Sequence, residues 1–123
     1  MVVLVSADET HGAMSLLEET VPPGWAPPAH IHHRAAELLY VLEGSYTFEV
    51  DGDRTVVPAG SHMVVPAGTP HTWQSGSGGG RMLIVFAPGG MEAYFAELSA
   101  QPNDAQPDRL GRSERYGMEI IPD

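Results

Sequence analysis

Short apolar runs separated by glycine, proline and other turn residues recur along most of the chain. Leu38–Leu42 and Tyr46–Val50 are two such runs, and Asp51-Gly52 follows the second. Asp-Gly after an apolar run is a strong signal for a tight β-hairpin, here with Arg54–Val57 as the returning strand. This part of the chain therefore predicts consecutive antiparallel strands.

The same pattern continues on both sides of the hairpin. The pentapeptide VVPAG occurs at Val56–Gly60 and again at Val64–Gly68, and each copy predicts a strand followed by a turn. Ala13–Glu19 and Arg81–Ala87 predict further strands, whereas SGSGGG at Ser75–Gly80 predicts a mobile surface loop. Several short strands at this spacing favour an all-β sandwich or small barrel over an open α/β sheet.

One segment has the periodicity of a helix. After Pro88-Gly89-Gly90, apolar residues occur at positions i, i+3, i+4 and i+7, which form one stripe along a helix. They are Met91, Tyr94, Phe95 and Leu98. The stripe predicts a short helix over about 90–99 that packs on the sheet, where it can also close one mouth of a barrel. The remaining 100–123 predicts a tail in which Leu110–Ile121 docks as a last short element.

Length and charge limit the classes of protein and partner. The 123 residues, 42% hydrophobic and 18% charged, predict one domain over 1–123 with a single modest core. Because there is no apolar run of about eighteen residues and no basic signal peptide, we expect a soluble cytoplasmic protein. The formal net charge of -10, with arginine but no lysine, repels phosphate backbones and anionic lipid. Neither nucleic acid nor a membrane is expected as a partner.

The chain has no cysteine, which excludes disulfides, thiolate nucleophiles and thiolate-bound metals. Any metal site must therefore use histidine and carboxylate ligands. His30 and His32 have the parity of one face of an extended segment, whereas His33 points to the other face. Glu37 has the wrong parity for an uninterrupted strand, so a bend around Arg34–Ala36 must bring its carboxylate to the two imidazoles.

A further histidine follows in the segment GSHMVVPAGTPHTWQS, which begins at Gly60. Thr69-Pro70 predicts a turn that starts a strand with His71 and Trp73 on one face, so His71 is a candidate fourth ligand. Trp73 has the parity to line a cavity, although packing alone also explains an inward tryptophan. Surface or loop positions are expected for His11, His33 and His62.

Residues at fixed intervals resemble the two sequence motifs of the cupin family. The first motif corresponds to Gly24, His30, His32, Glu37 and Gly44, and the second to Gly60, Pro66, Gly68 and His71. The resemblance covers Gly24–Ser75. It departs from the family pattern at Ser61, where Asp is common, and at Ser75, where Asn is usual. Neither position is a metal ligand in the family, so these departures concern loop geometry.

Resemblance to the cupins implies an all-β fold, a single double-stranded β-helix or jelly-roll barrel, with a barrel core over about 10–88 and a short C-terminal helical segment. It also implies one divalent metal ion per chain, bound inside the barrel by His30, His32, Glu37 and His71. Three imidazoles and a carboxylate suit Fe, Mn, Ni, Co, Cu or Zn, and the sequence leaves this choice open. Such a site keeps coordination positions open for a substrate.

The resemblance is strongest to small quercetin dioxygenase-like cupins and to single-cupin cyclases of aromatic polyketide pathways. It implies dioxygenation or metal-assisted cyclisation of a small aromatic or polyketide-like oxygenated substrate, with Glu37 moving a proton. Zinc serves only the second reaction, because it has no redox chemistry. Inward apolar residues are expected to form the substrate cavity, with Ser75–Gly80 and the helix near its mouth. These residues are Leu39, Val41, Phe48, Met63, Val65, Trp73 and Phe86.

Two other classes of function stay open. Some small cupins bind a small molecule without catalysis, and others are metal-dependent isomerases or lyases. A sugar isomerase would require a more polar cavity than the apolar inward residues predict. For assembly, Met1–Val5 is apolar and uncharged, and we expect it to pair with a second subunit in a homodimer, as the resemblance also implies. The alternative is that Met1–Val5 adds an edge strand to its own sheet.

Overall fold

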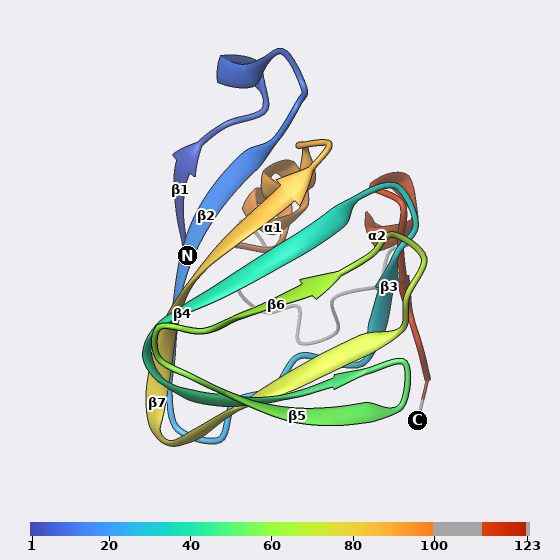
Figure 1. Cartoon of the computed structure of the whole chain (residues 1–123). Coiled ribbons are helices and arrows are strands. Elements are labelled where there is room, and N and C mark those ends of the chain that lie inside the picture. Colours follow the sequence, from blue (N-terminus) through green and yellow to red (C-terminus); the bar gives the residue numbers. More distant parts are fainter. Residues whose placement is uncertain (100–111, 123) are drawn as a thin grey trace.

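The computed structural model describes residues 1–99 and 112–122, which form an eight-stranded antiparallel sheet that curls around an interior (Figure 1). Its strands are β1 (Val2–Val5), β2 (Ser15–Val21), β3 (His30–His32), β4 (Ala36–Val50), β5 (Asp53–Pro58), β6 (His62–Val65), β7 (His71–Ala87) and β8 (Met118–Ile120). The helical elements are η1 (Asp8–Thr10), α1 (Met91–Ser99) and α2 (Arg112–Arg115). This confirms the predicted all-β jelly-roll type of fold. No helix in the described ranges is long and apolar enough to cross a membrane.

Two long strands, β4 and β7, organise the sheet. They pair with each other over most of their length, and β4 also pairs with β5 and β6 while β7 pairs with β2 and β3. Two register shifts near Gly44 interrupt the β4–β7 pairing, and the sheet folds over there so that its halves face each other. The predicted strands Leu38–Leu42 and Tyr46–Val50 are therefore two parts of one bent strand.

The predicted hairpin forms at Asp51-Gly52. β4 ends at Val50, which pairs with Asp53 at the start of β5. Asp51 and Gly52 both have positive φ, 50° and 86°, as a two-residue turn that matches the twist of its strands requires. The turn residues thus set the register of this strand pair.

The prediction of a mobile loop at Ser75–Gly80 is wrong, because these residues lie within β7. Gly80 pairs with Gly44 of β4 and with Val21 of β2. A methyl group at Gly80 would come within 2.5–2.7 Å of the phenol of Tyr46, so glycine here permits close packing rather than flexibility. Ser75–Gly80 therefore does not form the mobile loop that was expected near the mouth of a cavity.

β1 pairs with β2 of its own chain, which is the alternative that the sequence left open for Met1–Val5. It stands at one end of the strand order, and its outer edge has no partner strand in the described part of the chain. Val2, Val3 and Leu4 are 55%, 48% and 45% exposed. Pairing of this edge with a second subunit stays a prediction.

α1 packs on the barrel as its apolar stripe predicts. Met91 and Tyr94 are buried and Phe95 is partly buried against the core, whereas the side chain of Leu98 lies outside the described residues. β8 pairs with β3 and supplies the last short element that Leu110–Ile121 predicts. The first part of the predicted tail, 100–111, lies outside the described residues.

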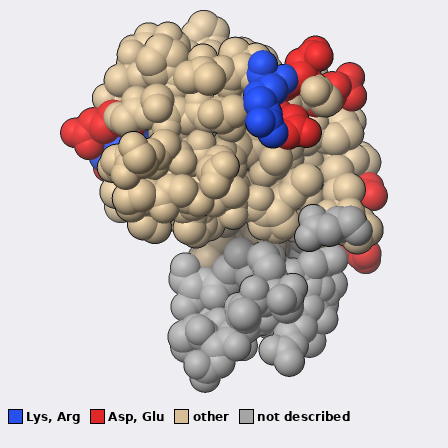
Figure 2. Space-filling view, turned by 90° about the horizontal axis from the view of Figure 1, so that it is seen from below, with Lys and Arg blue, Asp and Glu red and all other residues tan. Residues whose placement is uncertain are grey.

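The charged side chains do not gather on the face seen from below in Figure 2. Most described side chains there are uncharged, and the charged ones lie at the margins. Arginines pair with nearby carboxylates: Arg54 with Glu49, Arg81 with Glu18 and Glu43, and Arg115 with Glu97. These positive charges are thus neutralised locally.

Candidate metal centre

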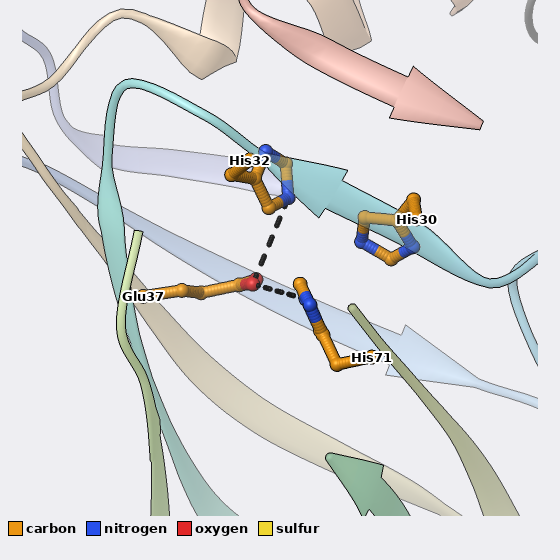
Figure 3. A group of neighbouring side chains, drawn as sticks. All are labelled: His30, His32, Glu37 and His71. Carbon is orange, nitrogen blue, oxygen red and sulfur yellow. Dashed lines mark hydrogen bonds and ion pairs between the residues drawn. The ribbon is translucent and has the colours of Figure 1, made fainter. Parts of the chain in front are cut away.

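The four predicted ligands meet inside the barrel (Figure 3). His30 and His32 come from β3, Glu37 from the start of β4, and His71 from the start of β7. All four are buried, with exposed fractions of 8%, 4%, 5% and 3%. Each offers one ligand atom, and these atoms lie within 4.8 Å of one another. That spread is close to the separation of donors around a single ion.

A strand pairing and a bend bring these side chains together. His30 lies directly opposite His71 in the β3–β7 pairing, so the two imidazoles point to the same side of the sheet. A bend at 33–34 separates β3 from β4. It breaks the alternation of side chains and lets Glu37 face the histidines, as parity predicts.

The other histidines lie outside the cluster. His33 and His62 are exposed, as predicted, and so is His11, which follows η1. His33 Nε2 lies 2.8 Å from Glu119 Oε1 at the surface. His33 is adjacent to His32 in the chain but lies at the surface, outside the cluster, which makes it a suitable control residue.

Backbone carbonyls fix the orientation of two imidazoles. His30 Nδ1 lies 2.8 Å from the carbonyl oxygen of Pro28, and His71 Nδ1 lies 2.9 Å from that of Thr69. Because a carbonyl only accepts, each Nδ1 carries hydrogen and donates it, which leaves each Nε2 available for the cluster. Metal-binding histidines are commonly held in this way.

Glu37 and His71 are in contact within the cluster. Glu37 Oε1 lies 2.9 Å from His71 Nε2 and 3.7 Å from His32 Nε2. Because His71 Nδ1 already donates to Thr69, a neutral His71 would turn the lone pair of Nε2 toward the carboxylate. A positive species, either a proton or a metal cation, is therefore required between the two atoms.

Burial and mutual charge set the protonation of the cluster. Burial lowers the pKa of His30 and lowers the pKa of His32 to about 4. Burial also acts to lower the pKa of His71, but the hydrogen bond to Glu37 and its negative charge outweigh burial and raise it. Burial acts to raise the pKa of Glu37, and the hydrogen bond from His71 together with the histidine charges outweighs burial and lowers it. The cluster thus offers neutral imidazoles, a carboxylate and one proton that a metal can displace.

This donor set fits a divalent ion of the first transition series. Three imidazoles and one carboxylate suit several such metals. His32 Nδ1 is buried without a hydrogen-bond partner among the described residues. The ring of His32 is instead held by packing, edge-on to Phe86 with ring centroids 5.1 Å apart.

A cavity of about 280 Å³ opens beside the cluster, and His30, His32 and Glu37 form part of its wall. The rest of the wall is mostly apolar. It comes from the chain end, β2, the segment before β3, β7, α1 and β8, and consists of Met1, Glu19, Trp25, Pro27, Pro28, Trp73, Ile84, Tyr94, Phe95, Met118 and Ile120. The Trp25 and Trp73 ring centroids lie 5.2 Å apart. The candidate metal centre therefore faces an aromatic cavity.

Of the seven residues predicted to form the substrate cavity, Trp73 lines this cavity. Six lie elsewhere: Leu39, Val41, Phe48, Val65 and Phe86 are buried in the core, and Met63 is partly buried against it. Parity identified which residues face inward. It does not tell which inward residues pack on one another and which remain open to a cavity.

Two wall residues, Trp25 and Glu19, were not predicted from the sequence to belong to the site. Trp25 lies in the irregular segment between β2 and β3, where no periodic pattern marks a residue as inward. Glu19 lies on β2 and shares the parity of the buried Leu17 and Val21. An acidic residue on the otherwise apolar face of a strand is the sequence feature from which Glu19 could have been predicted as a site residue.

The fold and the cluster together define a small β-barrel protein with an internal site of the metal-binding type. Residues 17–92 match the Cupin domain, and the chain belongs to the cupin family. A comparison with functionally curated protein sequences gives no match.

Solved structures share this fold. KdgF from Halomonas sp. is 20% identical, covering 67% of this chain and 74% of KdgF, with a TM-score of 0.64. The polyketide cyclase RemF from Streptomyces resistomycificus is 30% identical, covering 69% of this chain and 61% of RemF, with a TM-score of 0.60. The DMSP lyase DddQ from Ruegeria pomeroyi DSS-3 is 23% identical, covering 62% of this chain and 39% of DddQ, with a TM-score of 0.57. KdgF and DddQ show the fold alone.

Proposed function

We propose that this cupin is a metal-dependent enzyme that acts on a small aromatic or polyketide-like oxygenated substrate, by metal-assisted cyclisation rather than dioxygenation. The observation that carries the proposal is the position of the buried cluster at the wall of an aromatic cavity. A structural metal site is closed by its ligands, whereas a site that opens to a cavity can admit a substrate.

The cavity favours a compact and uncharged substrate. Its volume of about 280 Å³ lies at the lower end of ligand pockets, which hold about 300–1,000 Å³, so one or two rings fit. Trp25 and Trp73 offer apolar faces on which a planar ring can pack. The wall residues that the structure describes include two carboxylates, Glu19 and Glu37, and no arginine or lysine, which disfavours an anionic substrate.

His30, His32, Glu37 and His71 would hold the metal. A divalent ion bound there supplies Lewis acidity toward a substrate oxygen. The protein positions and charges the ligands. The carbonyls of Pro28 and Thr69 orient the imidazoles of His30 and His71, and the lowered pKa of Glu37 keeps this carboxylate ionised at neutral pH.

Likeness to a polyketide cyclase supports cyclisation as the reaction class, since RemF is 30% identical to this chain. Dioxygenation is the alternative outcome, because the same donor set also suits redox-active metals. A non-catalytic binding module and an isomerase or lyase are the remaining alternatives.

The test uses the two tryptophans of the chain, both of which line the cavity. The protein is stripped and reloaded separately with Zn(II), Fe(II), Mn(II) and Ni(II), and a panel of flavonols and phenolic polyketides is added. Tryptophan fluorescence measures binding, an oxygen electrode measures oxygen uptake, and mass spectrometry measures products. Cyclised product from the zinc form without oxygen uptake is the expected result.

His32→Ala and His33→Ala form a matched pair of controls, because only His32 faces the cluster. His32→Ala should lose metal and turnover, while His33→Ala should keep both. Oxygen uptake with Fe(II) but not with zinc would select dioxygenation. Fluorescence quenching without turnover in any metal form would select the binding module.

A further inference from the structure

Glu19 occupies an unusual place on β2. It pairs with Met82 of β7, and its neighbours on the same face, Leu17 and Val21, are buried. Glu18 points to the opposite face, where its carboxylate lies 3.2 Å from the guanidinium of Arg81. Adjacent glutamates thus have opposite environments: one is paired at the surface and the other lines the cavity.

The Glu19 carboxylate has no hydrogen bond or ion pair with another described residue, although it is partly buried. A structural role would require a partner, since burying a carboxylate without one is costly. The buried hydroxyl of Tyr46, whose pKa is raised by burial and then by the charge of Glu19, also lacks a hydrogen-bond partner among the described residues. The group is therefore free to interact with a molecule in the cavity.

Glu19 is displaced along the barrel from the candidate metal centre. Glu37 pairs with Phe86 and Glu19 pairs with Met82, four residues earlier on β7. Four residues correspond to a displacement of about 13 Å along the strand direction. Because both side chains line one cavity, a substrate of one or two rings anchored at the metal centre extends toward Glu19.

Electrostatics agree with this placement. Burial raises the pKa of Glu19 to about 7, the positive amino end of Met1 lowers it, and the negative charge of Glu37 raises it. Burial, followed by the charge of Glu19, raises the pKa of Tyr46 to about 12. Glu19 can therefore both accept and return a proton near neutral pH, whereas Glu37 stays ionised among its histidines.

We propose that Glu19 is a catalytic residue that exchanges a proton with the bound substrate, in place of Glu37, which serves as a metal ligand. This inference rests on the proposed cyclisation. The Glu19 carboxylate takes a proton from the carbon next to a substrate carbonyl, and the electron pair of the broken C–H bond forms a C–C bond to a second carbonyl carbon of the same molecule. The oxygen of that second carbonyl recovers the proton from Glu19. Atoms and charge balance without an oxidant.

The test measures proton exchange without requiring the natural substrate. The zinc-loaded protein is mixed with 2′-hydroxyacetophenone in D₂O, and NMR follows deuterium incorporation into its methyl group. Glu19→Gln should slow the protein-catalysed exchange by about 100-fold or more, the usual contribution of a general base. Glu18→Gln, which removes the neighbouring carboxylate on the outer face, should leave the rate unchanged.

A pH profile and metal analysis separate a proton-transfer role from a structural one. The wild-type exchange rate should rise with pH until Glu19 is ionised, and this dependence should disappear in Glu19→Gln. Both variants should bind as much zinc as the wild type, because Glu19 is not a ligand.

The role of Glu19 is overturned if Glu19→Gln exchanges deuterium at the wild-type rate, or if the wild type does not exchange faster than buffer. The proposed cyclisation is then still tested separately by the assay of oxygen uptake and products. If exchange depends on Glu19 but no flavonol or polyketide is turned over, the proton-transfer role of Glu19 is supported and the proposed substrate class is wrong.

Discussion

Replacing Glu19 by glutamine should stabilise the metal-free protein at alkaline pH. The pKa of Glu19 rises from 4.5 to about 7, chiefly through burial. Below pH 4.5 the carboxyl group is protonated in both the folded and the unfolded chain. Between pH 4.5 and about 7 the unfolded chain releases its proton while the folded chain keeps it, so rising pH favours unfolding. Above about pH 7 the folded protein carries a poorly solvated carboxylate.

The size of the effect follows from the two pKa values. At about 1.4 kcal/mol per pH unit, the rise from 4.5 to about 7 corresponds to roughly 3 kcal/mol of unfolding free energy. Glutamine is neutral at every pH and resembles the protonated acid in shape, so this loss is absent from Glu19→Gln. The melting temperature of the variant should exceed that of the wild type by about 10 °C at pH 8, and the two should converge at pH 4.

The assay is urea unfolding at a series of pH values in the presence of a chelator, with Glu18→Gln as control. Glu18 is paired with Arg81 at the surface, so its replacement should change stability by at most about 1 kcal/mol, without this pH dependence. A bound divalent cation offsets the negative charge of Glu37, which raises the pKa of Glu19, so the Glu19→Gln difference should shrink after metal is added. A constant difference between Glu19→Gln and the wild type from pH 4 to pH 8 would refute the assignment of a partly buried, unpaired carboxylate.

Three further predictions concern the metal, the sheet and the assembly. His32→Ala should bind less metal than His33→Ala by elemental analysis, and added metal should raise the melting temperature of His33→Ala only; equal metal content would contradict the site. Gly80→Ala should destabilise the protein by about 1–3 kcal/mol in urea unfolding, because its methyl group would overlap the Tyr46 phenol; an unchanged midpoint would mean that β7 does not approach Tyr46 closely. Light scattering should find a homodimer that Val3→Glu dissociates, since Val3 is 48% exposed on the free edge strand; a wild-type monomer at micromolar concentration would exclude this assembly.

The sequence determined the parts of this protein that local chemistry controls. Positive φ at Asp51-Gly52 and strand alternation are properties of neighbouring residues, so the hairpin and the inward direction of His30 and His32 could be predicted. The bend before Glu37 followed from the same alternation. The intervals between the motif residues then identified His71 as the fourth member of the cluster.

Only the tertiary structure decided what lies around that cluster. Parity distinguishes inside from outside, but the closure of the barrel decides which inward side chains pack together and which border a cavity. Phe48 and Val65 became core, while Trp25, Glu19 and residues of α1 and β8 became wall. The glycines of Ser75–Gly80 have the composition of a flexible loop, yet they lie in β7, where Gly80 leaves room for the phenol of Tyr46 and Gly79 for the backbone of Val21. Such contacts join residues far apart in the chain, and no local pattern records them.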